Sequence, residues 1–316
     1  ATALERPKMA ANGWRRSWTG SLPKQVTNEG LTSEGLTMRL SIFTDEVSKR
    51  SERAIELAKS WGVSHVEVRS LDSGRFPRAP DNEMEDFHRR LSDAGLAVSG
   101  VSPGLFKCAV DDAMVKPGLD EVLPRACEWA RRWGTDLVSS FGFGRRNGDT
   151  VPQEVVDLVE RMASIAQRCG CRLVLENESV CWGDTGLNAA DIIRRADHPN
   201  LSLCWDPGNA ARAGSASPFP DEYRQIRDLV THVHVKNFDA DSGRWSLMES
   251  GIVDWPGQLA ALREDGFAGF IVVETHTDIS VEEFEPLGAG LDVLEENSLR
   301  NLHYLRSLTG PGPSPD

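Results

Sequence analysis

The sequence predicts a single α/β domain, a (β/α)8 or TIM barrel, preceded by an N-terminal extension. Short apolar runs rich in β-branched residues alternate with longer helical patterns, and eight such runs lie between residues 38 and 274. The chain has 316 residues, and barrels of roughly 250 residues commonly form one unit. The first run is followed by FTDEVS rather than a GxGxxG turn, which disfavours an open doubly wound sheet.

The predicted strands share a high content of Val, Ile, Leu and Phe between turn-forming residues. In chain order they are residues 38–43, 65–69, 97–102, 136–141, 172–176, 201–206, 232–236 and 270–274. A helical pattern follows each strand, and several of these patterns end at a glycine, as in KSWG and QRCG. Strands and helices in this regular alternation predict a parallel sheet that closes on itself.

The predicted barrel occupies residues 38–308. Residues 1–37 are polar and aperiodic, so we predict a partly disordered extension there. Residues 309–316, which include GPGPSPD, predict a disordered tail.

The amino-acid composition makes some kinds of binding partner improbable for this chain. The chain has 35 Lys and Arg against 48 Asp and Glu, a formal net charge of −13, which disfavours nucleic acid as a partner. Its six cysteines form no CxxC pair, so reduced thiols are expected. The sequence has no apolar run of about 18 residues and no signal-peptide pattern. We therefore predict a cytoplasmic protein that binds neither nucleic acid nor membrane.

The last four predicted strands each bring an ionisable residue to their carboxyl end, where TIM barrels have their active sites. These residues are Glu176, Asp206, His234 and Glu274. Three carboxylates meeting at one mouth would repel one another unless a cation lay between them. We predict one divalent metal ion, Mn²⁺ first, with Mg²⁺, Co²⁺ and Zn²⁺ as alternatives. The competing interpretation is that they are unrelated polar residues capping the following helices.

The segment THVHVKN places two histidines on one side of a strand, because side chains alternate along it. His234 lies nearer the mouth and is the predicted metal ligand. His232 lies one layer deeper and is expected to need a buried hydrogen-bond partner. Lys236 is predicted to be the rim cation nearest the substrate.

The motifs LVLENES, LCWDPGNA, HVHVKN and VVETH, together with FTDEVS, VEVRSL and GIVDW, resemble the xylose isomerase-like barrel superfamily, which contains sugar phosphate isomerases and epimerases. The resemblance covers about residues 38–306. It implies that Glu176, Asp206, His234 and Glu274 are the metal ligands. It also implies that Glu176 and Glu274 form the acid/base pair, which moves an α-proton of a polyhydroxy ketone through a metal-stabilised enediolate.

Two positions depart from the ketose 3-epimerase pattern, in which a His follows the metal Asp by three residues and an Arg follows the metal His by six. Here these positions hold Asn209 and Ala240, and Lys236 is more similar to inosose dehydratase relatives. The alternative function is therefore a lyase, either a dehydratase or an enzyme that cleaves 3-keto-glycosides by β-elimination. A more remote alternative is an endonuclease IV-like phosphodiesterase, disfavoured by the few histidines at strand ends. A catalytically silent binding barrel is a further class.

Six residues at or beyond the carboxyl ends of strands are predicted to bind substrate, a sugar or cyclitol: Glu67, Lys107, Trp182, Asn209, Lys236 and His276. For Glu67 the alternative is a structural ion pair with Arg69. For Trp182 the alternative to a wall against the sugar is loop packing. Association of identical subunits also stays open.

Overall fold

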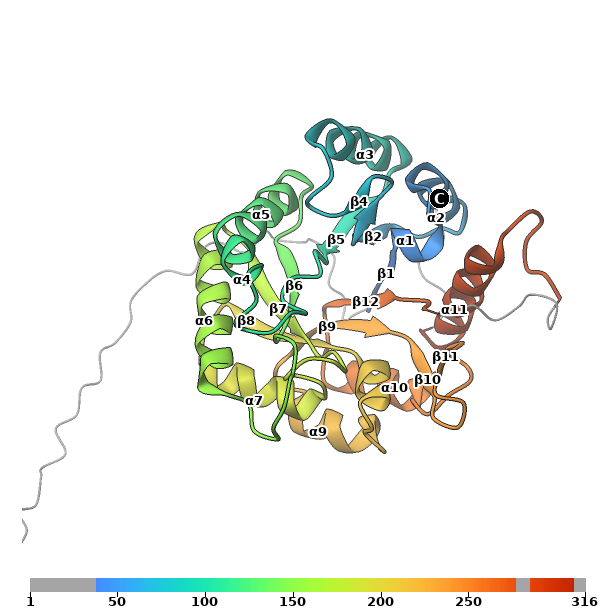
Figure 1. The fold of residues 1–316 in the computed structure, drawn as a ribbon. Coiled ribbons are helices and arrows are strands. Elements are labelled where there is room, and N and C mark those ends of the chain that lie inside the picture. Colours follow the sequence, from blue (N-terminus) through green and yellow to red (C-terminus); the bar gives the residue numbers. More distant parts are fainter. Residues whose placement is uncertain (1–37, 277–284, 310–316) are drawn as a thin grey trace, which may run out of the picture. The chain divides into compact units, whose positions relative to one another are not determined.

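Eight parallel strands form a closed barrel with helices around its outside (Figure 1), and the predicted TIM barrel is confirmed. This computed structural model describes residues 38–276 and 285–309, so the predicted extension at residues 1–37 and residues 310–316 of the tail lie outside it. In barrel order the strands are β1 (Arg39–Phe43), β12 (Phe270–Val273), β9 (Val230–Val235), β8 (Leu201–Trp205), β7 (Arg172–Glu176), β6 (Leu137–Phe141), β5 (Ala97–Val101) and β2 (His65–Val68). All eight coincide with predicted strands.

The longer helices are α2 (Ser51–Ser60), α3 (Asp81–Ala94), α5 (Leu123–Arg132), α6 (Gln153–Arg168), α7 (Gly186–Ala196), α10 (Trp255–Glu264) and α11 (Val293–Thr309). Shorter helical segments are α1 (Thr44–Val47), α4 (Val115–Pro117), η1 (Gly118–Val122), α8 (Pro207–Arg212), η2 (Pro218–Glu222) and α9 (Tyr223–Ile226). Since α11 ends at Thr309, the first residue of the predicted tail is helical.

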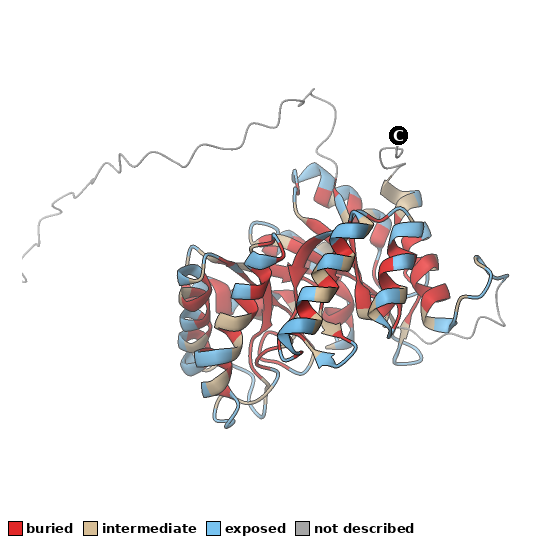
Figure 2. Cartoon of the chain, turned by 90° about the horizontal axis from the view of Figure 1, so that it is seen from above, coloured by how far each residue is buried: buried red, intermediate tan, exposed pale blue. Residues whose placement is uncertain are grey.

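Burial follows the layers of the barrel (Figure 2): the strands are buried and the outward helix faces are exposed. In α6, Val155, Val159 and Met162 recur at helical spacing and pack in the core between helices and strands. Val233 and Val235 of β9 belong to the same core. The alternate residues of β9 therefore point inside the barrel, as the pattern THVHVKN predicts.

Two short antiparallel hairpins, which the sequence reading did not predict, extend from the strands. One joins β3 (Ser70–Leu71) to β4 (Gly74–Arg75) after β2, and the other joins β10 (Asn237–Asp239) to β11 (Arg244–Ser246) after β9. Both follow the carboxyl end of a barrel strand, so they build up the rim of the mouth where a TIM barrel binds its ligands.

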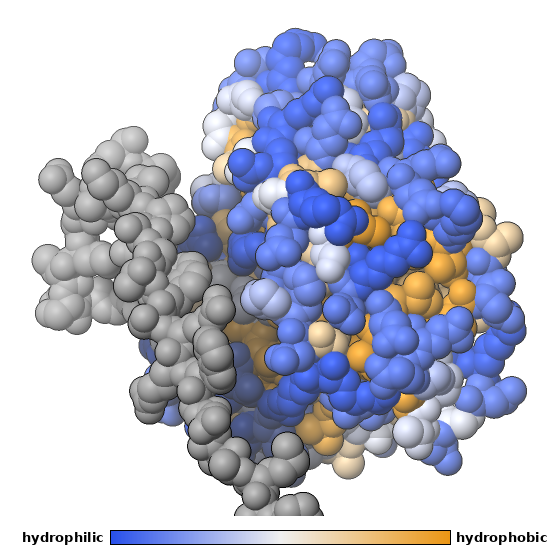
Figure 3. Space-filling model, turned by 90° about the vertical axis from the view of Figure 1, so that its left-hand side faces the viewer, coloured by the Kyte–Doolittle hydropathy of each residue, from blue (hydrophilic) through white to orange (hydrophobic). Residues whose placement is uncertain are grey.

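The face drawn in Figure 3 is mostly hydrophilic, with apolar residues visible between hydrophilic ones. All six cysteines are free thiols. Within residues 38–276 and 285–309, no helix has the length and apolar character needed to cross a membrane.

Gly269, which directly precedes β12, allows a test of how closely the barrel strands pack. A Cβ atom at Gly269 would lie 2.2 Å from the carbonyl oxygen of Thr231, which is backbone of the neighbouring β9. We expect Gly269→Ala to lower the free energy of unfolding by about 1–3 kcal/mol, because one strand must shift. Chemical denaturation measures this. Gly142→Ala is the control, since its Cβ would meet the flexible end of Ile192 at 3.3 Å; equal stabilities would contradict the predicted clash.

Candidate active site

The four predicted metal ligands come together at the mouth of the barrel. Glu176 ends β7, Asp206 directly follows β8, His234 lies in β9, and Glu274 directly follows β12. These four strands are consecutive in the barrel. Each residue offers one ligand atom, and these atoms all lie within 4.8 Å of one another. All four side chains are buried.

The ring of His234 is oriented as a metal ligand requires. Its Nε2 atom lies 3.2 Å from Oε1 of Glu67, while Nδ1 lies 3.2 Å from Oε1 of Glu176 and 3.8 Å from Oε2 of Glu274. A proton on Nε2 would leave the Nδ1 lone pair facing the carboxylates. Burial disfavours the charged ring, but Glu176 and Glu67 outweigh it and raise the pKa of His234.

Asp206 is held at the bottom of the cluster. Its Oδ1 atom accepts a hydrogen bond of 2.8 Å from the backbone N–H of Asn209, which caps α8. Its Oδ2 atom lies 2.9 Å from Nζ of Lys236 but accepts no hydrogen bond. Burial and the nearby Glu274 and Glu176 raise the pKa of Asp206 to about 7 despite Lys236.

These contacts fit a bound divalent cation. Among the described residues, the buried Nδ1 of His234 and Oδ2 of Asp206 have no hydrogen-bond partner; Nδ1 faces Glu176 and Glu274, and Oδ2 lies beside the Lys236 ammonium. Three carboxylates and one imidazole suit Mn²⁺, Mg²⁺, Co²⁺ or Zn²⁺ rather than a soft metal. Glu176, Asp206, His234 and Glu274 are therefore the residues that would hold the ion.

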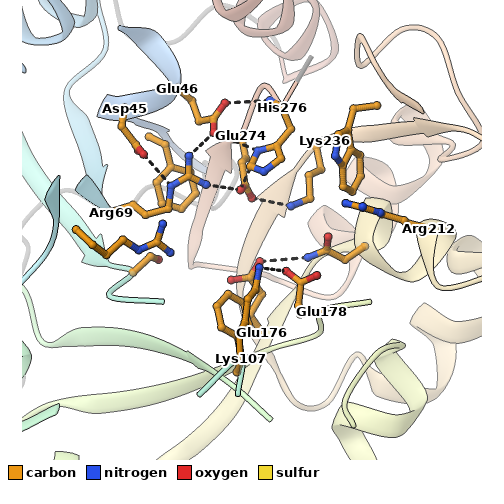
Figure 4. Close-up of a pocket in the computed structure, with 16 residues that line it drawn as sticks. Asp45, Glu46, Arg69, Lys107, Glu176, Glu178, Arg212, Lys236, Glu274 and His276 are labelled. Atoms are coloured by element: carbon orange, nitrogen blue, oxygen red, sulfur yellow. Dashed lines mark hydrogen bonds and ion pairs between the residues drawn. The ribbon is translucent and has the colours of Figure 1, made fainter. Parts of the chain in front are cut away.

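The two predicted catalytic carboxylates have different surroundings (Figure 4). Glu274 is enclosed by basic side chains: Nη1 of Arg69 lies 2.8 Å from Oε1, Nζ of Lys236 2.9 Å from Oε2, and the ring Nδ1 of His276 3.2 Å from Oε1. Burial alone would raise its pKa, but Lys236, His276 and Arg69 hold the pKa of Glu274 well below its usual range.

Glu176 has fewer partners. Its Oε1 atom accepts a hydrogen bond of 3.3 Å from Nδ2 of Asn209 and lies near His234. Burial disfavours ionisation, yet the neighbouring His234 keeps the pKa of Glu176 below its usual value. Neither Lys nor Arg of the described residues forms an ion pair with it within 4.0 Å.

Glu67 and His232 support the site from beneath. The Nε2 atom of His232 lies 2.7 Å from Oε2 of Glu67, whose other oxygen faces His234 and also accepts a hydrogen bond from Ser102. Both His232 and Glu67 have no exposed surface. The expectation that His232 lies deeper and finds a buried partner is confirmed.

The mouth contains a cavity of about 310 Å³, at the lower end of the range for small-molecule sites. Lys107, Asn209, Lys236 and His276 line it, as four of the six predicted substrate contacts. Lys107 pairs with Glu178, with 2.5 Å between Nζ and Oε2.

The other two predicted substrate contacts lie elsewhere. Glu67 does not line the cavity, because its carboxylate is fully buried between the two histidines. Trp182 is only 8% exposed and packs in the core, with the guanidinium of Arg145 5.5 Å from its ring centre. The tryptophan that lines the cavity, beside Phe43 and Phe141, is Trp245 of β11, whose ring lies 5.0 Å from Nζ of Lys236.

Sequence reasoning missed a carboxylate cluster around Arg69. Its guanidinium pairs with Asp45 at 2.9 Å, with Glu46, and with Glu274. Asp45 and Glu46 come from α1, and Glu46 also lies 3.1 Å from Nδ1 of His276. The adjacent acidic residues in FTDEVS, directly after the first strand, could have indicated this cluster from the sequence. Arg75 and Trp245 gave none, because their hairpins are only two or three residues long per strand.

The chain belongs to the xylose isomerase-like TIM barrel family, whose model matches residues 55–297. Among curated proteins it is similar to the uncharacterised protein MJ1311 of Methanocaldococcus jannaschii, with 25% identity over 142 residues. That match spans 44% of this chain and about half (48%) of the relative.

Solved structures of the same fold include a D-allulose 3-epimerase from Methylomonas sp. in complex with D-allulose, with a TM-score of 0.67 and 18% identity over 86% of this chain and 97% of that one. Another is the probable 3-DHS dehydratase AsbF from Bacillus anthracis, with a TM-score of 0.63 and 17% identity over 83% and 97% of the two chains. At these identities the likeness shows the fold.

The ligand cluster predicts the effect of one substitution on metal content. Asp206→Asn keeps the helix cap, because Asn caps as well as Asp, but removes a charged ligand. We expect bound Mn²⁺ to fall from about one per chain to near zero by elemental analysis after dialysis. Asp254→Asn, which alters the cap of α10 away from the site, should keep its metal. Full metal content in Asp206→Asn would show that the ion lies elsewhere.

Metal affinity should also rise with pH. With the pKa of Asp206 raised to about 7 and that of His234 raised above its usual value, both groups hold protons in acid, and metal must displace these protons. We expect the Kd for Mn²⁺ to weaken about tenfold or more between about pH 8 and about pH 6. Calorimetric titration in two buffers of different ionisation enthalpy would also count the released protons. An affinity independent of pH would contradict this.

Proposed function

We propose that this protein is a divalent-metal-dependent isomerase or epimerase of a polyhydroxy ketone, which acts by abstracting a proton next to the carbonyl. The observation that supports the proposal best is the convergence of Glu176 and Glu274 with Asp206 and His234 at a cavity of sugar-like size. A bound ion, Mn²⁺ first, would supply a Lewis acid that polarises the substrate carbonyl.

Glu176 is the proposed base. It lines the cavity, and among the described residues it has no Lys or Arg ion pair that would lower its affinity for a proton, unlike Glu274. Asn209 fixes its carboxylate by a hydrogen bond. Glu274 is the proposed acid that returns a proton to the substrate. In an isomerisation the proton goes to the neighbouring carbon, and in an epimerisation it goes to the opposite face of the same carbon.

Lys236 is the proposed electrostatic stabiliser of the enediolate. Its ammonium lies 2.9 Å from both Asp206 and Glu274, and it lines the cavity although it is only 3% exposed. Burial disfavours its charge, but Asp206 and Glu274 raise the pKa of Lys236, so the side chain stays cationic. A fixed cation in a water-poor site favours a developing negative charge.

Elimination is the second candidate, and the placement of cations favours it. Lys107 and Lys236 both line the cavity, so a second proton donor is available to a departing hydroxyl or alkoxide. Asn209 and Ala240 also stand where ketose 3-epimerases often have His and Arg. Both reactions begin with the same proton abstraction. The phosphodiesterase alternative is not favoured, because the ligand cluster contains a single histidine.

Exchange with solvent tests the common step. In D₂O with Mn²⁺, we expect deuterium at the α-carbon of a ketose or inosose substrate, detected by NMR. Glu176→Gln and Glu274→Gln should each slow this exchange by about 100-fold or more, because a general base is removed. Glu154→Gln, on an exposed part of α6, is the matched control. Metal content of each variant separates loss of the ion from loss of the base. Unchanged exchange in both site variants would refute the assigned pair.

A further inference from the structure

Two cations of the cavity form no ion pair with a carboxylate of the residues that the structure describes. Five cationic and five carboxylate side chains line it. Arg69, Lys107 and Lys236 are committed to ion pairs with carboxylates. Arg75 and Arg212 are different: in residues 38–276 and 285–309, neither has a carboxylate oxygen within 4.0 Å of its guanidinium.

Arg75 is the more informative of the two because it is partly buried. Its guanidinium donates one long hydrogen bond within the described residues, 3.4 Å from Nε to the carbonyl oxygen of Pro103. Burial and the neighbouring Arg69 lower the pKa of Arg75, and the more distant carboxylates of Asp45, Glu274 and Glu176 offset this only in part. Arg212 is exposed, with its guanidinium 5.1 Å from the Trp245 ring centre, so water can solvate it.

The backbone beside Arg75 makes room for the guanidinium. Gly104 has a φ of +67°, and a Cβ atom there would lie 2.2 Å from Nη2 of Arg75. Any side chain at position 104 would therefore displace the guanidinium from its present place. The β3–β4 hairpin brings Arg75 to the cavity, and the lack of a side chain at Gly104 leaves space for its guanidinium.

The position of Arg75 suits one end of a substrate. It follows β2, whereas the four metal ligands belong to β7, β8, β9 and β12, which form the other part of the ring. A ligand held at those four residues would extend across the mouth toward Arg75. When a divalent ion is bound, the lining residues together with Asp206 and His234 carry one positive charge in excess, if both histidines of this set are neutral.

We propose that the substrate is a monoanionic polyhydroxy ketone whose carboxylate pairs with Arg75, while its hydroxy-ketone end lies at Glu176, Asp206, His234 and Glu274. This inference rests on the proposed function and names its substrate class. A planar guanidinium can bind both oxygens of a carboxylate, which gives the pair direction as well as charge. The class is thus the keto acids derived from sugars, rather than neutral ketoses.

Calorimetric binding to the Mn²⁺-loaded protein tests this, with matched probes that differ only by a carboxylate in place of a hydroxymethyl group. D-fructuronate and D-tagaturonate are compared with D-fructose and D-tagatose. We expect the ketouronates to bind about tenfold to 100-fold more tightly. Arg75→Gln should weaken ketouronate binding by about the same tenfold to 100-fold factor and ketose binding by a clearly smaller factor. Arg78→Gln, an exposed arginine on the same segment, should behave as the native protein.

The outcomes separate the two proposals. Tighter binding of neutral ketoses by the native protein overturns the carboxylate inference and leaves the proposed function in place, whether or not Arg75→Gln folds. The carboxylate inference is also overturned if Arg75→Gln weakens the binding of ketoses and of ketouronates by the same factor. Tighter binding of D-fructose 6-phosphate than of D-fructuronate would assign the site to a phosphate instead. If no probe binds and none exchanges its α-proton in D₂O, the proposed function itself is contradicted.

Discussion

Repulsion among buried carboxylates is the constraint on which the rest of this structure depends. Glu176, Asp206 and Glu274 are placed within a few ångströms of one another, where water cannot screen their charges. Lys236 and Arg69 relieve part of this repulsion, while burial, together with Glu274 and Glu176, still raises the pKa of Asp206. The mouth is therefore organised to hold positive charge, which side chains supply and to which a bound divalent ion would add.

Several features of the fold serve this balance. The turn α1 brings Asp45 and Glu46 to Arg69, so that this arginine is fixed while it holds Glu274. The β10–β11 hairpin brings Trp245 over Lys236 and leaves the ammonium turned toward the ligand cluster. The segments added to the regular barrel thus lie where charged side chains must be positioned around a ligand.

The barrel and the convergence of the four proposed metal ligands could be predicted because both follow from short-range patterns. Strand alternation identified His234 and His232, and strand ends identified Glu176, Asp206 and Glu274. Glu67 and Trp182 were misplaced because the sequence shows that a residue follows a strand but not how deep its side chain lies. Arg75 and Trp245 depend on hairpins whose strands are too short to leave a periodic signal.

The contact of Glu67 with both histidines links β2 to β9, two strands that are not neighbours in the barrel. It acts as an internal strut, so that the angle of the His234 ring is set by the opposite part of the wall. A change in barrel cross-section would turn this ring. Metal coordination would thereby report the shape of the whole scaffold, and substitutions in β2 far from any ligand could alter metal preference.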